Sequence, residues 1–325
     1  MSQKASIIIL NWNGLDDTIE CIDSLRRITY PDYEVVVVDN ASSGNDVGVL
    51  RGRYVNSITL IANDKNYGFS GGNNIGMKYA MDTGAEYIVL LNNDTVVDPE
   101  FLSELVKCAQ GIPQAGILAG KIYYYDSPNR LQSVGGGVNW LLGRINHYGE
   151  KEDVGQFDKV ADRDFIYANG MLIRRQVVET ISYLDATFFF GIEEYDYCMR
   201  AIRAGFQVVY VPTAKIWHKS GASRKKLSQY PETEKIIIAE TGGANLYKHF
   251  YRLFKKHNPP VIFLFSFASY MITRQASRFG GGVIYSLVHR DLSLVRRYLR
   301  ARFKRKTDHR PVNRGGTHAK ESKER

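Results

Sequence analysis

The chain has 325 residues, 44% of them hydrophobic and 24% charged, which is the composition of a globular protein and excludes collagen, a coiled coil and a wholly disordered chain. Its formal net charge of +9 lies entirely in the C-terminal tail, because residues 290–325 contain 13 Lys and Arg against 4 Asp and Glu, while residues 1–289 contain 30 of each sign. A body without excess positive charge argues against a surface built to track nucleic acid, so we expect no nucleic-acid partner.

Four short apolar runs in the first hundred residues predict strands. They are rich in Val and Ile and uninterrupted, as strands buried on both faces of a parallel sheet are, and they occupy residues 6–10, 34–38, 58–62 and 87–91. Three helices are expected beside these strands. The first places Ile19, Ile22, Leu25 and Ile28 on one face, the second ends at Gly84, and the third runs from Asp98 to Gln110. This alternation predicts an α/β fold in which helices flank a mainly parallel sheet.

The second half of the chain has a less regular pattern. Glycine-rich residues 135–137 and the polar stretch 149–163 predict loops around a mixed sheet. The elements expected after them are a helix over 193–204, a strand over 207–211, a break at Pro212 and a strand-like run over 214–217. Residues 220–231 are polar, basic and without periodicity, so we expect a mobile loop near whatever the site binds.

The C-terminal region predicts contact with a membrane. Residues 258–273 carry no charge, but sixteen residues are fewer than the roughly 20 that a spanning helix needs. Basic residues flank the segment, so we predict a helix in the membrane interface, with a core helix or an oligomer contact as the alternative. With the basic tail, it predicts peripheral association with the inner face of the cell membrane. We expect a catalytic domain over 1–250 and a helical, membrane-associating extension over 251–325.

The cysteines and the N-terminus indicate a cytoplasmic protein. Cys21, Cys108 and Cys198 are odd in number and far apart, which fits neither a disulfide framework nor a zinc site. The first residues lead directly into the strand pattern at 6–10, without the long apolar core of a signal peptide. We therefore expect a protein of the reducing cytosol.

Polar side chains follow each of the four predicted strands. Because the ligand crevice of an open α/β sheet lies beyond the carboxyl ends of its strands, these residues are the first candidates for a site. They are Asn11, Asn13 and Gly14 after the first strand, Asp39, Asn40 and Ser42 after the second, Asn63, Asn66 and Gly68 after the third, and Asn92, Asn93 and Asp94 after the fourth. Each alone is an ordinary loop residue, but together they predict one polar rim.

Two of these positions indicate how a nucleotide would be held. Asp39 can accept a hydrogen bond from the ring N–H of a pyrimidine, and a helix cap or an Asx turn is its alternative role. The glycine-containing run 66–74 leads into a helix N-terminus and permits close approach of anionic groups. Neither this run nor residues 116–121 have the spacing of an NAD or ATP loop.

Carboxylates and a histidine supply candidates for a metal site and a general base. Asp94 stands at a strand end, where one carboxylate with diphosphate oxygens commonly holds Mg²⁺ or Mn²⁺, and the imidazole of His218 suits the same shell. Their alternative roles are a turn cap and a structural histidine. Three carboxylates, those of Glu193, Glu194 and Asp196, lie at a helix start behind three phenylalanines. Burial against these rings would raise the pKa of one of them and suit it to general-base catalysis.

These residues fall in seven ordered motifs that resemble family 2 of the inverting glycosyltransferases, a family of GT-A fold, and especially its rhamnosyltransferase-like members. The motifs span residues 8–14, 37–43, 66–74, 91–95, 168–170, 193–196 and 217–219. The resemblance covers roughly residues 5–250. It departs from the family pattern at Asn92, where members often have Asp, and at Glu194, where Asp is common.

The resemblance implies a role for each motif. Asp39 and the segment at Asn11 would hold the nucleotide base, while Asp94 and His218 would hold a divalent metal, Mg²⁺ or Mn²⁺. The acidic helix start would supply the catalytic base, for which we favour Glu194 over its two neighbours. The nucleotide-sugar-binding residues expected on this basis are Asn11, Asn13, Asp39, Asn66, Gly68, Gly72, Asn73 and Asn93.

The resemblance also implies the reaction, a metal-dependent, inverting transfer of a hexose from a dTDP- or UDP-sugar to a hydroxyl of a glycan or lipid-linked glycan in cell-surface polysaccharide synthesis. Rhamnose is the sugar that it favours. Two alternatives stay open. A sugar nucleotidyltransferase needs the same sheet, glycine-rich loop and metal carboxylate, and Asn92 suggests a non-catalytic module that binds nucleotide sugars.

Overall fold

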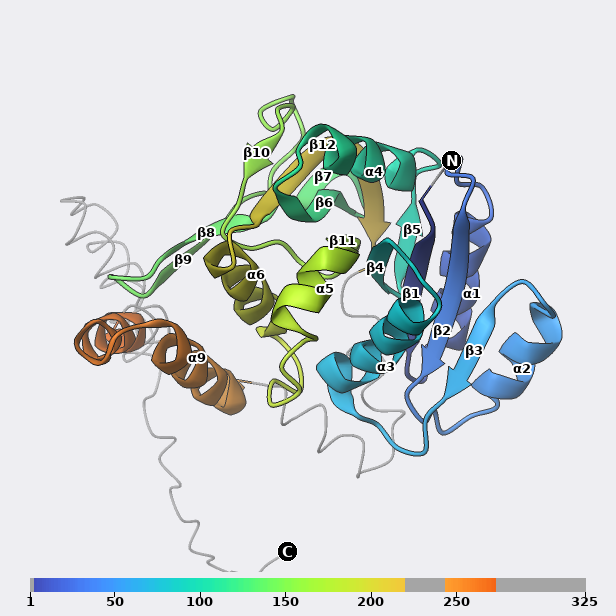
Figure 1. The fold of residues 1–325 in the computed structure, drawn as a ribbon, viewed down its shortest axis with the longest axis horizontal. Coiled ribbons are helices and arrows are strands. Elements are labelled where there is room, and N and C mark those ends of the chain that lie inside the picture. The colour runs from blue at the N-terminus through green and yellow to red at the C-terminus, as the bar shows by residue number, and fades with distance from the viewer. Residues whose placement is uncertain (1–2, 220–242, 273–325) are drawn as a thin grey trace, which may run out of the picture. The chain divides into compact units, whose positions relative to one another are not determined.

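The structure is a computed structural model that describes residues 3–219 and 243–272 (Figure 1). The chain divides into two compact units, Met1–Phe267 and Ala268–Arg325, and every labelled helix and strand lies in the first. The loop predicted at 220–231 and the basic tail lie outside the described residues. The domain boundary expected after residue 250 stays a prediction, and helix α9 (Gly243–His257) runs across it.

Strands and helices alternate through the first part of the chain. In order, they are β1 (Ala5–Asn11), α1 (Leu15–Leu25), β2 (Tyr33–Asp39), α2 (Asp46–Arg53), β3 (Thr59–Ala62), α3 (Gly68–Asp82), β4 (Tyr87–Asn92), β5 (Thr95–Val97) and α4 (Phe101–Gly111). Strands dominate the second part, which contains β6 (Ala115–Tyr124), β7 (Ser127–Ser133), β8 (Gly136–Asn139), β9 (Arg144–His147), β10 (Ala161–Asp162), β11 (Met171–Arg174), α5 (Arg175–Ile181), α6 (Glu193–Arg203) and β12 (Gln207–His218).

One large sheet organises these elements, in the strand order β10-β12-β6-β11-β4-β1-β2-β3 (Figure 1). Strands β4, β1, β2 and β3 run parallel, as the four apolar runs predicted. Strand β11 enters antiparallel between β4 and β6, and β12 returns parallel to β6. The fold class is therefore confirmed as α/β, with helices flanking a sheet whose N-terminal half is parallel throughout.

Alternate residues of the central strands face different helices, which is why those strands are apolar without interruption. Ile7 and Ile9 of β1 belong to a buried cluster that includes residues of α1 and α4. Ile8 points the other way, toward α3, where a Cβ added to Gly76 would lie 2.5 Å from the Ile8 Cγ2 atom. The glycine thus permits the close approach of α3, and both faces of β1 are excluded from water.

The second half differs from the prediction at Pro212. The break expected there is wrong, because β12 continues from Gln207 to His218 and only its register against β6 shifts between Val211 and Lys215. A bulge leaves residues unpaired, so the missing N–H of proline costs no ladder hydrogen bond. Gly120 of β6 lies below the bulge, where a Cβ would collide with the Ala214 carbonyl oxygen.

Two segments expected as loops contribute short strands. Residues 136 and 137 begin β8, which pairs with β9 in a separate two-stranded sheet, and the stretch 149–163 ends in β10. Residues 260–272 are helical, in agreement with the helix predicted over 258–273. Among the residues that the structure describes, no helix has the length and apolar character required to span a membrane.

Candidate active site

Asn11 is the centre of the polar network at the strand ends. The parallel register places it directly beside Asp39, and its side chain is fully buried. Its Nδ2 donates to Asp39 Oδ2 at 2.7 Å and to Asp46 Oδ2 at 3.0 Å, while its Oδ1 accepts from Thr18 Oγ1 at 2.8 Å. One neutral amide therefore separates two buried carboxylates and ties the ends of β1, β2 and α2 together.

The Asp39 carboxylate keeps accepting capacity beyond these contacts. Ser42 donates its hydroxyl to Oδ2 at 2.7 Å and its backbone N–H to Oδ1 at 3.0 Å. With the bond from Asn11, three of the roughly four acceptor positions of a carboxylate are used. Asn13 clamps the adjoining loop, since its Oδ1 accepts from the Ser43 N–H at 2.8 Å. The predicted Asx turn and a ligand-binding role for Asp39 are thus compatible.

The glycine-containing run is organised by Asn40, a residue of the polar rim that was not among the predicted binding residues. Its Nδ2 donates to Asn66 Oδ1 at 2.8 Å and to the Gly68 carbonyl at 3.1 Å. The left-handed φ of +74° at Gly68 opens α3, and a Cβ there would collide with Phe189. The signal that pointed to Asn40 was its position directly after β2.

Two of the predicted binding residues pack inside the fold. A Cβ on Gly72 would lie 2.5 Å from a methyl of Leu10, so this glycine lets α3 approach the sheet. The Asn73 side chain is buried and donates to the Phe69 carbonyl at 2.9 Å within the same helix. Both residues therefore contribute to the packing and internal hydrogen bonding of α3, and this helix begins at Gly68.

Asp94 and His218 lie side by side, as the family resemblance implied. Antiparallel pairing of β5 with β12 places Thr95 opposite His218, which brings Asp94 Oδ1 within 3.0 Å of His218 Nε2. The other ring nitrogen, Nδ1, lies 2.9 Å from Gln132 Oε1, and such a partner fixes the orientation of a ligating histidine. Burial raises the pKa of Asp94, but the hydrogen bond and electrostatic attraction of His218, a backbone hydrogen bond and the charge of Lys219 together outweigh it, and the pKa lies below its usual range.

The residues present fit a small divalent cation. Asp94 Oδ1 and His218 Nε2, which lie 3.0 Å apart, are a carboxylate oxygen and an imidazole nitrogen, the donor types that would hold Mg²⁺ or Mn²⁺. Asn92 Oδ1 is buried and has no hydrogen-bond partner among the described residues. No group of three His, Cys, Asp or Glu gathers in that part of the chain, so diphosphate oxygens and waters would complete the shell.

Lys219 anchors the end of β12 beside this pair. Its ammonium lies 2.6 Å from Asp17 and 2.5 Å from Glu20, and its backbone N–H donates to the Asp94 carbonyl at 3.0 Å. Burial lowers the pKa of Lys219, but the two carboxylates of α1 raise it above its usual range. Lys219 thus remains charged and links α1 to the place where Asp94 and His218 meet.

Asn93 joins the two halves of this edge. Its Nδ2 donates to Thr18 Oγ1 at 3.0 Å and to the Gly14 carbonyl at 3.3 Å, and it lies 3.5 Å from Asn11 Oδ1. The candidate nucleotide-binding residues and the Asp94 pair therefore lie at the same carboxyl edge of the sheet, joined in the chain at Asn93 and Asp94.

Two glutamates at the start of α6 are buried and hold raised pKa values. Burial raises the pKa of Glu193 well above its usual range, and the neighbouring charge of Glu194 raises it further. Its Oε2 accepts from the Ile192 N–H at 2.9 Å, a bond that serves the helix start. Burial also raises the pKa of Glu194, against a hydrogen bond from the Ala168 backbone. Glu194 is the less buried of the two, 8% exposed against 1% for Glu193, and it stays the predicted base.

Asp196 does not share this environment. Its side chain is fully buried, and both oxygens are occupied: Oδ2 by Arg200 Nε at 2.9 Å, and Oδ1 by Lys256 Nζ and His257 Nε2, each at 2.8 Å. Burial raises the pKa of Asp196, but the hydrogen bonds from His257 and Lys256 outweigh it and bring the pKa to about 2. A carboxylate so engaged is a poor proton acceptor, so we remove Asp196 from the candidate bases.

Helix α3 connects the glutamates to the rest of the site. The segment that leads into α6 is tied to α3 by Ser70 Oγ, which donates to the Phe188 carbonyl at 2.7 Å, and by the Phe69 N–H, which donates to the Phe189 carbonyl at 2.8 Å. The first turn of α3 is held by Asn40 as well. The nucleotide-binding edge and the acidic helix start therefore flank the same helix N-terminus.

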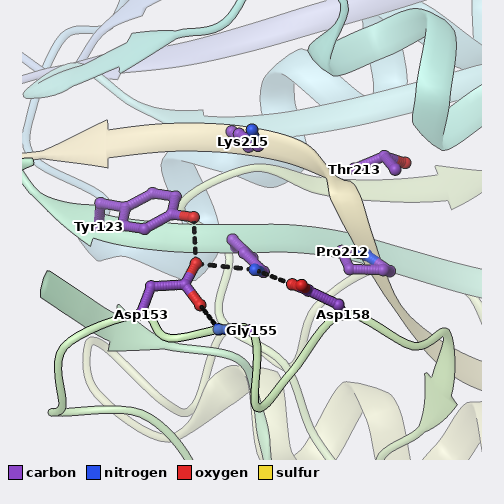
Figure 2. Close-up of a pocket in the computed structure, with 8 residues that line it drawn as sticks. Tyr123, Asp153, Gly155, Asp158, Pro212, Thr213 and Lys215 are labelled. Carbon is purple, nitrogen blue, oxygen red and sulfur yellow. Dashed lines mark hydrogen bonds and ion pairs between the residues drawn. The ribbon is translucent and has the colours of Figure 1, made fainter. Parts of the chain in front are cut away.

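A polar cavity of about 460 Å³ opens beside the bulge of β12 (Figure 2). Among its lining residues, the buried Lys121 Nζ lies 2.7 Å from Asp153 and 2.6 Å from Asp158, and the Tyr123 hydroxyl donates to Asp153 at 2.6 Å. Figure 2 shows Tyr123 of β6 pointing toward Asp153 of the 149–163 segment. No sequence pattern predicted this cluster, which fastens that segment to the sheet.

Comparison with known proteins places these features in a family context. A profile of Glycosyl transferase family 2 matches residues 6–181. The chain is 28% identical over 211 residues to the low-salt glycan biosynthesis hexosyltransferase Agl10 of Haloferax volcanii, covering 64% of each chain. It is 24% identical over 193 residues to the dTDP-rhamnosyl transferase RfbF of Shigella flexneri, covering 59% of this chain and 62% of that one. The chain thus spans less than two thirds of the length of both relatives.

The fold is also found among solved structures. The mannosyltransferase PcManGT from Pyrobaculum calidifontis, in complex with GDP-Man and Mn²⁺, superposes with a TM-score of 0.53 at 14% identity, covering 90% of this chain and 81% of that one. This similarity agrees with the predicted GT-A architecture.

Proposed function

The chain belongs to glycosyl transferase family 2, and from this membership we propose that it transfers a hexose from a nucleoside-diphosphate sugar to a hydroxyl of a glycan, with inversion at the anomeric carbon. The observation that carries the proposal is the carboxyl edge of the sheet, where the Asn11 and Asp39 network reaches Asn93 and the next residue, Asp94, meets His218. A ligand with a hydrogen-bonding base at one end and an anionic group at the other would suit this edge.

The side chains divide the work along this edge. Asp39, with its remaining lone pair, would accept the ring N–H of a pyrimidine, and the first turn of α3 would face the phosphates. Asp94 and His218 would hold Mg²⁺ or Mn²⁺, which when bound neutralises charge on a departing diphosphate. The occurrence of Mn²⁺ with GDP-Man in the similar mannosyltransferase structure supports this assignment.

Glu194 would act as the general base. As the acceptor oxygen bonds to C1 of the sugar, the bond from C1 to the diphosphate breaks on the opposite face, and the acceptor proton passes to the Glu194 carboxylate. One displacement of this kind inverts the anomeric centre. The burial that raises the pKa of Glu194 also makes its ionised form more basic than an exposed glutamate.

Similarity to RfbF supports a thymidine-diphosphate-linked rhamnose as the donor, and similarity to Agl10, named for glycan biosynthesis, supports a glycan as the acceptor. A panel of dTDP-, UDP- and GDP-sugars, assayed for nucleoside diphosphate with and without Mn²⁺, tests the reaction. We expect release that depends on an added acceptor. Pyrophosphate as the product would point to a nucleotidyltransferase instead, and donor binding without turnover on any acceptor would point to a binding module.

We further propose that the enzyme works at the cytoplasmic face of a membrane. In the helix over 260–272, Val261, Leu264 and Phe265 are 77%, 68% and 71% exposed, a set of apolar side chains that suits the lipid interface. Co-sedimentation of the full chain with phosphatidylglycerol vesicles should fall sharply when Leu264→Glu and Phe265→Glu are combined. Equal sedimentation of both proteins would remove this segment as the membrane contact.

A further inference from the structure

The first turn of α6 needs support from outside the helix. It carries Glu193, Glu194 and Asp196 within four residues, and Ile192, which precedes the helix, has no side-chain group that could cap it. Carboxylates at a helix N-terminus are favoured by the helix dipole, but three of them in one turn repel each other when ionised. The position of Glu194 therefore depends on whatever holds this turn.

Helix α9 supplies that support through Asp196. His257 and Lys256 reach the buried Asp196 Oδ1 from the last turn of α9, each at 2.8 Å, and the His257 side chain is 1% exposed. A further contact joins the same two helices, in which the donor belongs to α6: the Arg203 guanidinium donates to the His257 carbonyl. Two helices separated by about forty residues of sequence are thus joined inside the protein by the Lys256 ion pair and by hydrogen bonds.

The same helix grips the segment that leads into α6. Lys256 Nζ lies 2.7 Å from Asp185, and Arg252 donates to the Thr187 carbonyl at 3.0 Å. The rings of His249 and Phe188 lie 5.9 Å apart. Helix α9 therefore holds both the approach to α6 and its first turn, while contacts of α3 hold the other side of that approach.

We propose that Lys256 and His257 are positioning residues for the transfer reaction: acting through Asp196, they fix the first turn of α6 and thereby the place of Glu194 relative to the acceptor. This inference rests on the proposed function for its catalytic consequence. It also means that the catalytic unit extends to the end of α9, so that a chain cut after residue 250 loses two of the three side chains that bind Asp196.

The role can be separated from simple stabilisation because the donor side of the site meets the segment before α6 only at the first turn of α3. In the described part of the chain, the contacts given above for Asn11, for Asp39 and for the Asp94 and His218 pair do not include α9. Loosening the turn of α6 should therefore lower kcat much more than it changes the donor KM. Loss of the overall fold would change both.

The test uses His257→Phe, which keeps a ring but removes the donor, and His257→Gln, whose amide can still donate to Asp196. The exposed Lys255→Ala on the same helix is the matched control. We expect His257→Phe to lower kcat on the order of 10²-fold, the effect of displacing a catalytic group by about 1 Å, with the donor KM within about twofold of the wild type. His257→Gln should recover most of the loss, and Lys255→Ala should behave as the wild type.

A double variant tests whether the effect runs through Asp196. In an Asp196→Asn background the carboxylate is already absent, so adding His257→Phe should lower kcat by much less than it does alone. Equal losses in the two backgrounds would show that His257 acts by another route and would overturn the proposal.

Hydrogen exchange gives a readout that does not depend on activity. In His257→Phe, backbone amides of residues 188–198 should exchange faster than in the wild type, while those of β4 and β5 should not change. If the wild type turned over none of the sugar donors, the proposed function would fail. The exchange measurement would still show whether His257 of α9 stabilises the first turn of α6. Unchanged exchange at 188–198 in a folded His257→Phe protein would overturn the proposal.

Discussion

The substitution Asn11→Asp, which replaces the side-chain nitrogen by oxygen, tests whether Asn11 stabilises the network of candidate nucleotide-binding residues. In Asn11→Asp the shape of the side chain is kept, but the amide that donates to Asp39 at 2.7 Å and to Asp46 at 3.0 Å becomes a third carboxylate. Each lost bond is a hydrogen bond to a charged group, worth about 1.5 to 3 kcal/mol. The two together predict a loss of unfolding free energy of about 3 to 6 kcal/mol at pH 7.

Urea unfolding at pH 7.5 and at pH 5 measures this loss. When the introduced carboxyl group is protonated, it can again donate to one neighbour, so the deficit should be smaller at pH 5. Asn13→Asp is the matched control, because the contact from Ser43 requires only an acceptor at this position, and its stability should stay within about 1 kcal/mol of the wild type. An Asn11→Asp protein as stable as Asn13→Asp at pH 7.5 would refute the account of Asn11 as the donor between two buried carboxylates.

Three further predictions concern the acidic groups. Glu194→Gln should lower kcat about 10² to 10⁴-fold. In the wild type, kcat/KM should fall at low pH around a pKa above the ordinary value for glutamate, because burial raises the pKa of Glu194, and this fall should be absent in the variant. If the variant still loses activity at low pH in the same way, another residue is the base. Asp196, with a pKa of about 2, should contribute about 2 kcal/mol of stability that is present above pH 4 and lost as the pH falls toward 2, so unfolding of Asp196→Asn should depend less on acid than that of the wild type. Lys121→Met should cost about 3 kcal/mol in urea unfolding by leaving Asp153 without its cation, whereas the exposed Lys215→Met should cost almost nothing; equal values would deny the cluster its structural role.

The sequence predicted the parallel half of the fold because its strands are buried on both faces. Ile7, Ile8 and Ile9 each face a helix, so the run shows no polar interruption. The position of a polar residue directly after such a run then places it at the carboxyl edge, and the register that pairs Asn11 with Asp39 follows from two strands of equal length. Element type and strand ends were therefore enough to predict this part of the site.

Other parts of the site depend on contacts that leave no local pattern. Strand β5 has three residues, too few for any periodicity, yet its pairing with β12 is what brings Asp94 to His218, an association suggested only by residue chemistry and by family resemblance. Gln132 is an ordinary polar residue until the fold places it 2.9 Å from the His218 ring. Neither contact could be expected from the spacing of residues along the chain.

The acidic helix start shows the same limit. Sequence reasoning could not separate Asp196 from Glu193 and Glu194, because all three suit a helix N-terminus equally well. Their pKa values diverge only because Lys256 and His257 return to Asp196 from about sixty residues further along the chain, while the glutamates are buried without cations. Tertiary pairing, which sequence spacing does not reveal, decides which carboxylate is available for proton transfer.

The most direct test of the proposed chemistry is the Mn²⁺ dependence of acceptor-stimulated nucleoside diphosphate release, measured for the wild type and for Asp94→Ala with the sugar donor that gives the highest rate. The wild type should show saturable activation by Mn²⁺, and Asp94→Ala should release nucleoside diphosphate no faster than a reaction without enzyme at every Mn²⁺ concentration. Near-normal, Mn²⁺-dependent turnover by Asp94→Ala would contradict the assignment of Asp94 and His218 as the residues that hold the donor diphosphate through a cation.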